Sequence, residues 1–81
     1  MKDIKLYTGS NCWFCEQAKQ LLTRENLPFE NINLDDKLEL RMQLSKENGG
    51  YRTIPMIFID GKFIGGFNEL NALVKSGDLK S

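Results

Sequence analysis

The chain has 81 residues, 41% of them hydrophobic and 10% aromatic, and we expect it to form one small globular domain over residues 1–81. Its 11 basic and 11 acidic residues give a net charge of zero, and the sequence contains no basic patch that would predict nucleic-acid binding. The longest apolar run, residues 54–59, is too short to cross a membrane, and we expect no signal peptide before the first strand.

The first expected elements are a strand over residues 1–8 and a helix over residues 12–26. The strand is apolar at alternate positions, whereas the helical segment consists almost entirely of strong helix-formers. We expect the helix to end before Pro28, because proline disfavours helical geometry in the residue that precedes it. Four apolar side chains recur at helical spacing and predict the buried face: Phe14, Ala18, Leu21 and Leu22.

The rest of the chain predicts two more helices and three more strands. A strand, a helix and a second strand of these lengths imply a right-handed crossover and a parallel pair. Asp60-Gly61 favours a type I′ hairpin turn. The order β-α-β-α-β-β-α predicts an α/β fold with one mixed four-stranded sheet and helices packed on both faces. The later elements are expected at 29–34, at 37–48, at 56–59, at 62–64, and in a helix capped by Asn68 and closed by Gly77.

The segment Cys12-Trp13-Phe14-Cys15 lies where the first strand ends and the first helix begins. Backbone N–H groups at a helix N-terminus have no partner within the helix, and the helix dipole adds partial positive charge there. This environment favours a thiolate, which is the reactive form of cysteine. Cys12, at the N-cap, would receive most of the stabilisation. Cys15, one turn further, can close a disulfide with it.

Other interpretations of the two cysteines are weaker. A zinc site normally needs four protein ligands or three plus water, and the chain has two cysteines and no histidine, so we expect no metal. A structural disulfide over so short a loop would remove little chain entropy. Two buried, inert cysteines remain an alternative. The position between strand and helix favours a dithiol redox centre in a reducing compartment, which we expect to be the cytoplasm.

The element order, with C-x-x-C opening the first helix, Thr53-Ile54-Pro55 before the third strand and Gly65-Gly66 after the fourth, resembles the glutaredoxins. The resemblance covers nearly the whole chain and implies a thioredoxin-like fold. It implies that Cys12 is the nucleophile and Cys15 the resolving thiol. It also implies that Pro55 is cis and lies against the disulfide, so that an incoming thiol peptide pairs with the backbone of Ile54. The alternative for Pro55 is an ordinary proline at the start of a strand.

The resemblance further implies that glutathione is the reductant and that protein disulfides, such as that of ribonucleotide reductase, are substrates of a monomer. The turn over residues 66–68 corresponds to the family's clamp for a glutathione carboxylate, although turn glycines and an N-cap would explain it without a ligand. The residues expected to contact glutathione are Trp13, Phe14, Arg52, Thr53, Ile54, Pro55, Gly66, Phe67 and Asn68.

Three positions depart from the family pattern. Trp13 replaces a common proline, Phe14 replaces a common tyrosine, and Gly9 replaces a lysine that binds a glutathione carboxylate in many members. The missing positive charge at Gly9 is expected to weaken glutathione binding. Three side chains could supply a substitute: Arg52, Arg41 and Gln43.

Two further functions remain open. Tyr51-Arg52 together with Gly66-Phe67 is also similar to glutaredoxin-like redoxins that take electrons from thioredoxin reductase. The other is a non-catalytic carrier, in which a glutathione-assisted dimer holds an iron–sulfur cluster on Cys12.

Overall fold

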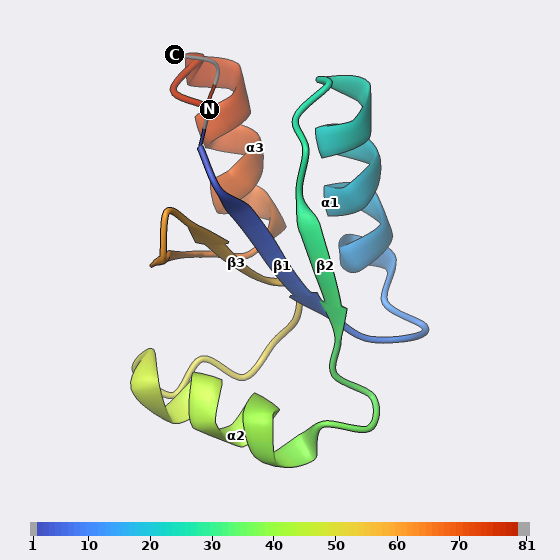
Figure 1. The fold of residues 1–81 in the computed structure, drawn as a ribbon, viewed down its shortest axis with the longest axis vertical. Coiled ribbons are helices and arrows are strands. Elements are labelled where there is room, and N and C mark those ends of the chain that lie inside the picture. The colour runs from blue at the N-terminus through green and yellow to red at the C-terminus, as the bar shows by residue number, and fades with distance from the viewer. Residues whose placement is uncertain (1, 80–81) are drawn as a thin grey trace.

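A four-stranded sheet forms the centre of the structure, a computed structural model that describes residues 2–79 (Figure 1). The strand order is β2-β1-β3-β4, with β1 parallel to β2 and antiparallel to β3, and with β3 antiparallel to β4. The mixed sheet and the order of its elements confirm the predicted thioredoxin-like architecture. The strands are β1 (Ile4–Thr8), β2 (Glu30–Asn33), β3 (Met56–Ile59) and β4 (Lys62–Gly65).

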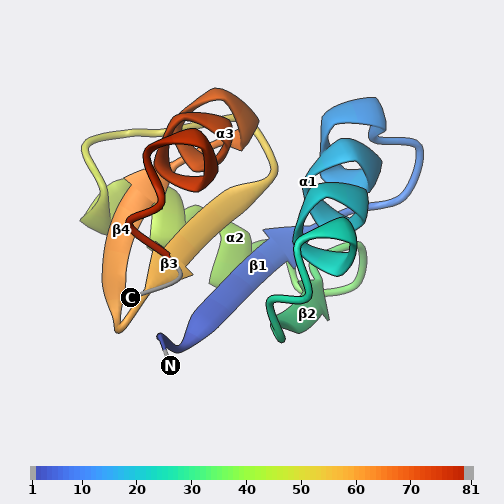
Figure 2. The same cartoon turned by 90° about the horizontal axis from the view of Figure 1, so that it is seen from above.

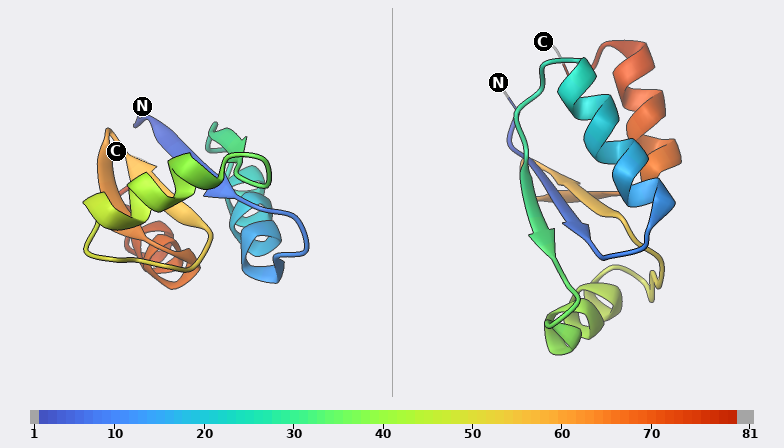
Figure 3. Two further views of the ribbon diagram at one scale, coloured as in Figure 1. Left: turned by 90° about the horizontal axis from the view of Figure 1, so that it is seen from below. Right: turned by 90° about the vertical axis from the view of Figure 1, so that its right-hand side faces the viewer.

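Helices lie on both faces of the sheet, as predicted. The helices α1 (Trp13–Arg24) and α3 (Phe67–Ser76) lie side by side on one face (Figures 2 and 3). Helix α2 (Leu38–Glu47) lies near the end of the sheet where β1 and β2 finish (Figure 1). Its buried residue Leu44 packs with Met56 of β3, on the face of the sheet opposite to α1 and α3.

Alternation along the strands divides the core in two. On one face, Leu6 of β1 and Ile57 of β3 are fully buried against Leu22 of α1 and Leu70 of α3. Each such side chain contributes about 1.5–3 kcal/mol relative to full exposure. The neighbouring strand residues point the other way, so that Met56 joins the smaller cluster beneath α2. The larger cluster thereby fixes α1, and with it the cysteine pair, on the sheet.

Strand β1 carries the chain directly to the cysteines, and its end is tied to the end of β2. Thr8 is paired with Asn33 in the parallel register, and the Leu34 N–H donates to the Thr8 carbonyl at 2.8 Å. The buried hydroxyl of Thr8 donates to Asn31 Oδ1 at 2.7 Å. The loops that follow the two strands therefore begin side by side.

The first helix ends for a reason other than the predicted one. Asn26 adopts a left-handed conformation with φ of 57°, and its N–H donates to the Thr23 carbonyl at 3.1 Å. The Leu27 N–H donates to the Leu22 carbonyl at 2.9 Å. These two bonds form a Schellman motif. The helix thus ends at its own left-handed cap, before Pro28 has any effect.

Three other expectations need correction. Asn68 does not cap the last helix, because α3 begins at Phe67 and Gly66 is its N-cap, two residues before the expected one. Phe14 does not belong to the buried face of α1, since half of it is exposed. Strand β1 begins at Ile4 rather than at the start of the chain, and the predicted strand residue Met1 lies outside the described residues. The hairpin turn is confirmed, because Asp60 and Gly61 have φ of 52° and 81°.

Candidate active site

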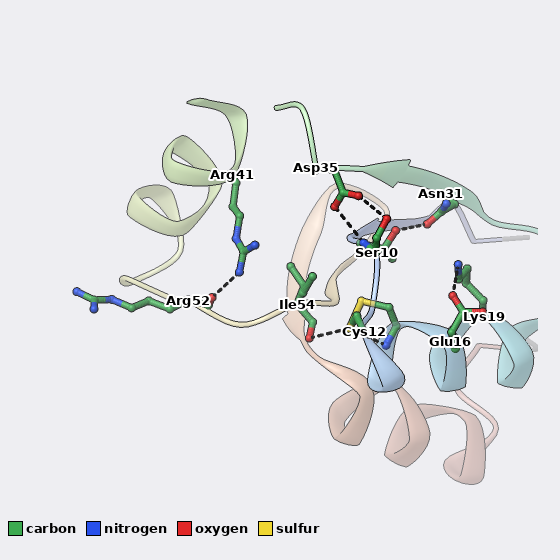
Figure 4. The surroundings of a disulfide bond; sticks show 11 residues. Ser10, Cys12, Glu16, Lys19, Asn31, Asp35, Arg41, Arg52 and Ile54 are labelled. Atoms are coloured by element: carbon green, nitrogen blue, oxygen red, sulfur yellow. Dashed lines mark hydrogen bonds and ion pairs between the residues drawn. A yellow bond between two sulfur atoms is a disulfide. The ribbon is translucent and has the colours of Figure 1, made fainter. Parts of the chain in front are cut away.

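Cys12 and Cys15 are joined in a disulfide with their Cα atoms 5.2 Å apart (Figure 4). Cys12 is the N-cap of α1, as predicted, and is partly exposed. Cys15 lies in the first turn and is completely buried. An external thiol or disulfide can therefore reach the sulfur of Cys12 but not that of Cys15.

The backbone around Cys12 favours a negative charge on its sulfur. The Cys15 N–H donates to Cys12 Sγ across 3.1 Å. This N–H belongs to the first turn of α1, where the helix dipole also contributes partial positive charge. Cys15 Sγ is instead enclosed by the core, where burial favours the neutral thiol.

The peptide bond between Ile54 and Pro55 is cis, as the family resemblance implied. Pro55 is buried, and the carbonyl oxygen of Ile54 lies 3.7 Å from Cys12 Sγ. A disulfide sulfur carries no proton, so this is a packing contact in the oxidised protein. After reduction, the same approach would allow the Cys12 thiol to donate to the Ile54 carbonyl.

A cleft with a volume of about 250 Å³ gathers six of the predicted contact residues. Phe14 forms part of its wall, with its ring centroid 6.1 Å from that of Phe67. Trp13 is 66% exposed and stacks edge-on against Phe14 at 5.1 Å. The residues lining the cleft are Phe14, Tyr51, Thr53, Pro55, Gly66, Phe67, Asn68 and Glu69.

The N-terminus of α3 opens onto this cleft. The Gly66 N–H donates to Glu69 Oε1 at 2.7 Å, which is half of a capping box. The first backbone bond of the helix runs from the Leu70 N–H to the Gly66 carbonyl at 3.1 Å. The N–H groups of Phe67 and Asn68 precede that bond and have no acceptor within the helix. They are the groups that an anionic ligand in the cleft would meet.

Arg52 is not brought to the cleft. Its side chain extends away from the disulfide, whereas Arg41 Nη2 donates to the Arg52 carbonyl at 3.1 Å (Figure 4). Both arginines line a separate groove beside the exposed side chains Leu38 and Met42. Of the three side chains expected to replace the missing lysine, Arg41 is anchored to the loop before Pro55.

Two residues of the cleft wall, Tyr51 and Glu69, are absent from the set predicted from the sequence. A Cβ atom added to Gly66 would lie 2.7 Å from the Tyr51 hydroxyl, so this hydroxyl closes over the glycine. Glu69 stands three residues after the N-cap, and this spacing is the sequence signature of a capping box. This signature is hard to recognise in the sequence because the N-cap is glycine, which lacks the usual hydroxyl or amide side chain.

A second polar group beside the disulfide is formed by Ser10 and Asp35 (Figure 4). The Ser10 N–H donates to Asp35 Oδ1 at 3.0 Å, and the Ser10 hydroxyl donates to Asp35 Oδ2. The bond from the hydroxyl, and to a smaller extent the bond from the backbone N–H, hold the pKa of Asp35 below its ordinary value. The signal in the sequence is positional: both residues follow parallel strands, whose carboxyl ends meet at one edge of a sheet.

Within residues 2–79, no group of three or more histidine, cysteine, aspartate or glutamate side chains is arranged to hold a metal ion. None of the helices in that same range is long and apolar enough to span a membrane.

Comparisons with known proteins agree on one family. A family model for glutaredoxins matches residues 4–64. The chain is 39% identical over 79 residues to a glutaredoxin of Pseudomonas aeruginosa, covering 98% of this chain and 93% of that protein. It is 35% identical over 79 residues to glutaredoxin 3 of Escherichia coli strain K12, covering 98% and 94%.

Solved structures show the same similarity. Wheat glutaredoxin superposes with a TM-score of 0.85 at 38% identity, covering 94% of this chain and 72% of that one. A buckwheat glutaredoxin–glutathione complex superposes with a TM-score of 0.88 at 26% identity, covering 98% and 74%.

Proposed function

The chain belongs to the glutaredoxin family and is a thiol–disulfide oxidoreductase, and on this premise we propose that glutathione is its reductant. The observation that carries the proposal is the juxtaposition of the accessible Cys12 sulfur, the Ile54 carbonyl 3.7 Å away, and a cleft that ends at the N-terminus of α3. These parts correspond to the sulfur, the peptide backbone and a carboxylate of one bound tripeptide.

The first half of the reaction removes glutathione from a glutathionylated protein. The Cys12 thiolate attacks the glutathione sulfur of the mixed disulfide, so that a bond forms between Cys12 and glutathione. The bond to the protein breaks, and the protein thiolate leaves and takes up a proton. Cys12 performs this step because its sulfur is exposed and accepts from the Cys15 N–H.

The second half returns Cys12 to the thiolate. The thiolate of a second glutathione attacks the glutathione sulfur bound to Cys12, which releases oxidised glutathione and restores the Cys12 thiolate. One half of the oxidised glutathione comes from the substrate, so each such cycle consumes one free glutathione, whereas reducing the Cys12–Cys15 disulfide consumes two. With a protein disulfide, Cys12 first forms a mixed disulfide with the protein. Cys15 then attacks Cys12, releases the reduced protein and leaves the disulfide seen in the structure.

The binding groups proposed for glutathione are mainly backbone atoms. The γ-glutamyl carboxylate would accept from the N–H groups of Phe67 and Asn68, and the cysteinyl backbone would pair with Ile54. The side chains of Phe14, Phe67 and Thr53 form the walls, while Trp13 borders the sulfur. Arg52 is proposed to act only through its backbone and its contact with Arg41.

The wider function proposed is reduction of protein disulfides in the cytoplasm by a monomer, with ribonucleotide reductase as one substrate. The monomer is supported by the completeness of the site, since both cysteines and the residues that line the cleft come from one chain. We propose that residues 1–81 act as one functional unit.

The test is a comparison of electron donors. The purified protein is supplied with a glutathionylated peptide, and NADPH oxidation is followed with glutathione plus glutathione reductase or, separately, with thioredoxin reductase. We expect much faster turnover with glutathione. Faster turnover with thioredoxin reductase would replace this function with that of a thioredoxin-reductase-dependent redoxin. The Cys12→Ser variant is the control and should be inactive with both donors.

A further inference from the structure

Asp35 borders the active site on the side of Cys12 that faces away from α3. Figure 4 shows Asp35 and Ser10 on one side of Cys12 and Ile54, and the last helix on the other. A Cβ atom added to Gly9 would lie 2.7 Å from Ile54 Cδ1 and 3.2 Å from Asp35 Oδ1. The side chain of Ile54 and the carboxylate of Asp35 therefore meet at Gly9. A peptide whose backbone pairs with Ile54 would therefore pass close to this edge.

The carboxylate of Asp35 is held in place, although it is exposed. Both of its oxygens accept from Ser10, one from the backbone N–H at 3.0 Å and the other from the hydroxyl. The Asp35 N–H donates to Asn33 Oδ1 at 2.7 Å, which fixes the backbone as well. The bonds from Ser10 also keep the pKa of Asp35 below its ordinary value. A fixed negative charge therefore stands at this edge at neutral pH.

No salt bridge within residues 2–79 neutralises the carboxylate of Asp35. The two salt bridges formed within residues 2–79 join Lys5 to Glu30 and Lys19 to Glu16, and neither involves Asp35. Arg41 is the cation anchored to the loop before Pro55, and one of its donors is already bonded to the Arg52 carbonyl. At Gly9 itself, the space next to the glycine is taken by Ile54 and Asp35. A ligand carboxylate that reaches Gly9 therefore meets the carboxylate of Asp35.

These observations rest on the proposed function and narrow its substrate class. A peptide with one end at the N-terminus of α3 and its sulfur at Cys12 places the next residue beside Gly9, because successive Cα atoms are about 3.8 Å apart. We propose that Asp35 selects against a free carboxylate on the residue that follows the reacting cysteine. The site therefore accepts that cysteine best when the chain continues through a peptide bond, as it does within a protein.

The test uses two thiols that differ only at that carboxylate: glutathione and its C-terminal amide. Each reduces the Cys12–Cys15 disulfide, and the second-order rate constant is followed by stopped-flow fluorescence of Trp13, the single tryptophan of the chain. The Asp35→Asn variant keeps the shape and an acceptor for the Ser10 N–H. It should raise the rate with glutathione about three- to fivefold relative to the rate with the amide, as expected for two charges about 5 Å apart in water.

Two variants separate charge from structure. Asp36→Asn removes the same charge one residue further on and should change the ratio of the two rate constants much less. Ser10→Ala loosens the loop but retains the Asp35 charge, so the wild-type preference for the amide should persist. In 1 M salt the effect of Asp35→Asn should shrink, because exposed charges are then screened beyond about 3 Å. Comparing ratios between proteins cancels the intrinsic difference in reactivity between the two thiols.

An unchanged ratio in Asp35→Asn overturns the proposal, and so does an equal change in Asp36→Asn. These rate constants require no reductase, so they can be measured whichever reductase proves to be the electron donor. If the ratio does not change but the protein cycles rapidly with glutathione reductase, the inference fails and the proposed function stands. If the ratio changes as expected but thioredoxin reductase is the better donor, the selectivity stands and the glutathione-dependent cycle fails.

Discussion

The backbone N–H of Cys15 donates to the sulfur of Cys12 across 3.1 Å, so the second cysteine stabilises the first through its main chain. This bond does not depend on the Cys15 side chain and should survive its replacement. The two residues therefore have separable roles, since the thiol of Cys15 can be removed without removing the donor that activates Cys12.

The first prediction concerns the pKa of Cys12. In the Cys15→Ser variant, the rate of alkylation of Cys12 measured against pH should show a midpoint below about 7, because the helix N-terminus and the residue 15 N–H favour the thiolate. The matched variant, Cys12→Ser, should react slowly at every pH, since Cys15 is completely buried. A midpoint for Cys12 near the ordinary value of about 8.5 would contradict the assignment.

The second prediction separates two kinds of substrate. Cys15→Ser should retain reduction of a glutathionylated peptide, because free glutathione can release the intermediate on Cys12. The same variant should lose most of its activity on a protein disulfide, where Cys15 is needed to release the bound protein. Cys12→Ser should lose both. If Cys15→Ser loses the two activities equally, the roles given to the two thiols are wrong.

The third prediction distinguishes the cap of α3 from its ligand site. Glu69→Ala removes the acceptor of the Gly66 N–H and should lower the free energy of unfolding by about 1 kcal/mol in urea titration. Asn68→Ala, one residue earlier and not a cap, should leave stability nearly unchanged. It keeps the backbone N–H but removes a polar side chain from the lining of the cleft, and should therefore raise the KM for glutathione several-fold. The reverse pattern, with Asn68→Ala the more destabilising, would return the capping role to Asn68.

Features that depend on neighbouring residues could be predicted from the sequence. The hairpin at Asp60-Gly61 was predictable because a type I′ turn requires positive φ at both positions, and these residues tolerate it. The cysteine pair was placed correctly at the N-terminus of α1 because strand, turn and helix-forming residues follow one another there. Local chemistry decides such features without reference to distant contacts.

Features that depend on distant contacts were not predictable in the same way. The bond between Ser10 and Asp35 depends on the register of the parallel strands β1 and β2, and the sequence predicts the parallel pair but not its register. Phe14 fits the helical periodicity of α1, but it is exposed and contacts Phe67 from the other end of the chain. The Ser10–Asp35 bond and the Phe14–Phe67 contact both belong to the active-site region. There, tertiary contacts rather than local preference decide the arrangement.

The fourth prediction tests the contact between Gly66 and Tyr51. Gly66 has φ of −111°, which alanine can adopt, so only the space matters. A Cβ at this position would lie 2.7 Å from the Tyr51 hydroxyl, and Gly66→Ala should therefore cost about 1–3 kcal/mol of stability and raise the KM for glutathione. Adding Tyr51→Phe removes the clashing oxygen and should recover part of both losses. Purely additive effects would show that the two groups do not meet.

The last prediction concerns the dependence of stability on pH. The bonds from Ser10 hold the pKa of Asp35 below its ordinary value in the folded protein. The stabilisation is therefore present above the unfolded pKa of about 3.9 and is lost as the pH falls through the lower folded pKa. Asp35→Asn should be less stable than the wild type in urea at pH 7, and the difference should narrow as the pH falls below about 4. In a Ser10→Ala background, the same substitution should have a smaller effect at pH 7, because the largest cause of the pKa shift is already gone. A difference that stays constant from pH 7 to pH 2 would show that the Ser10 bonds do not favour the ionised carboxylate.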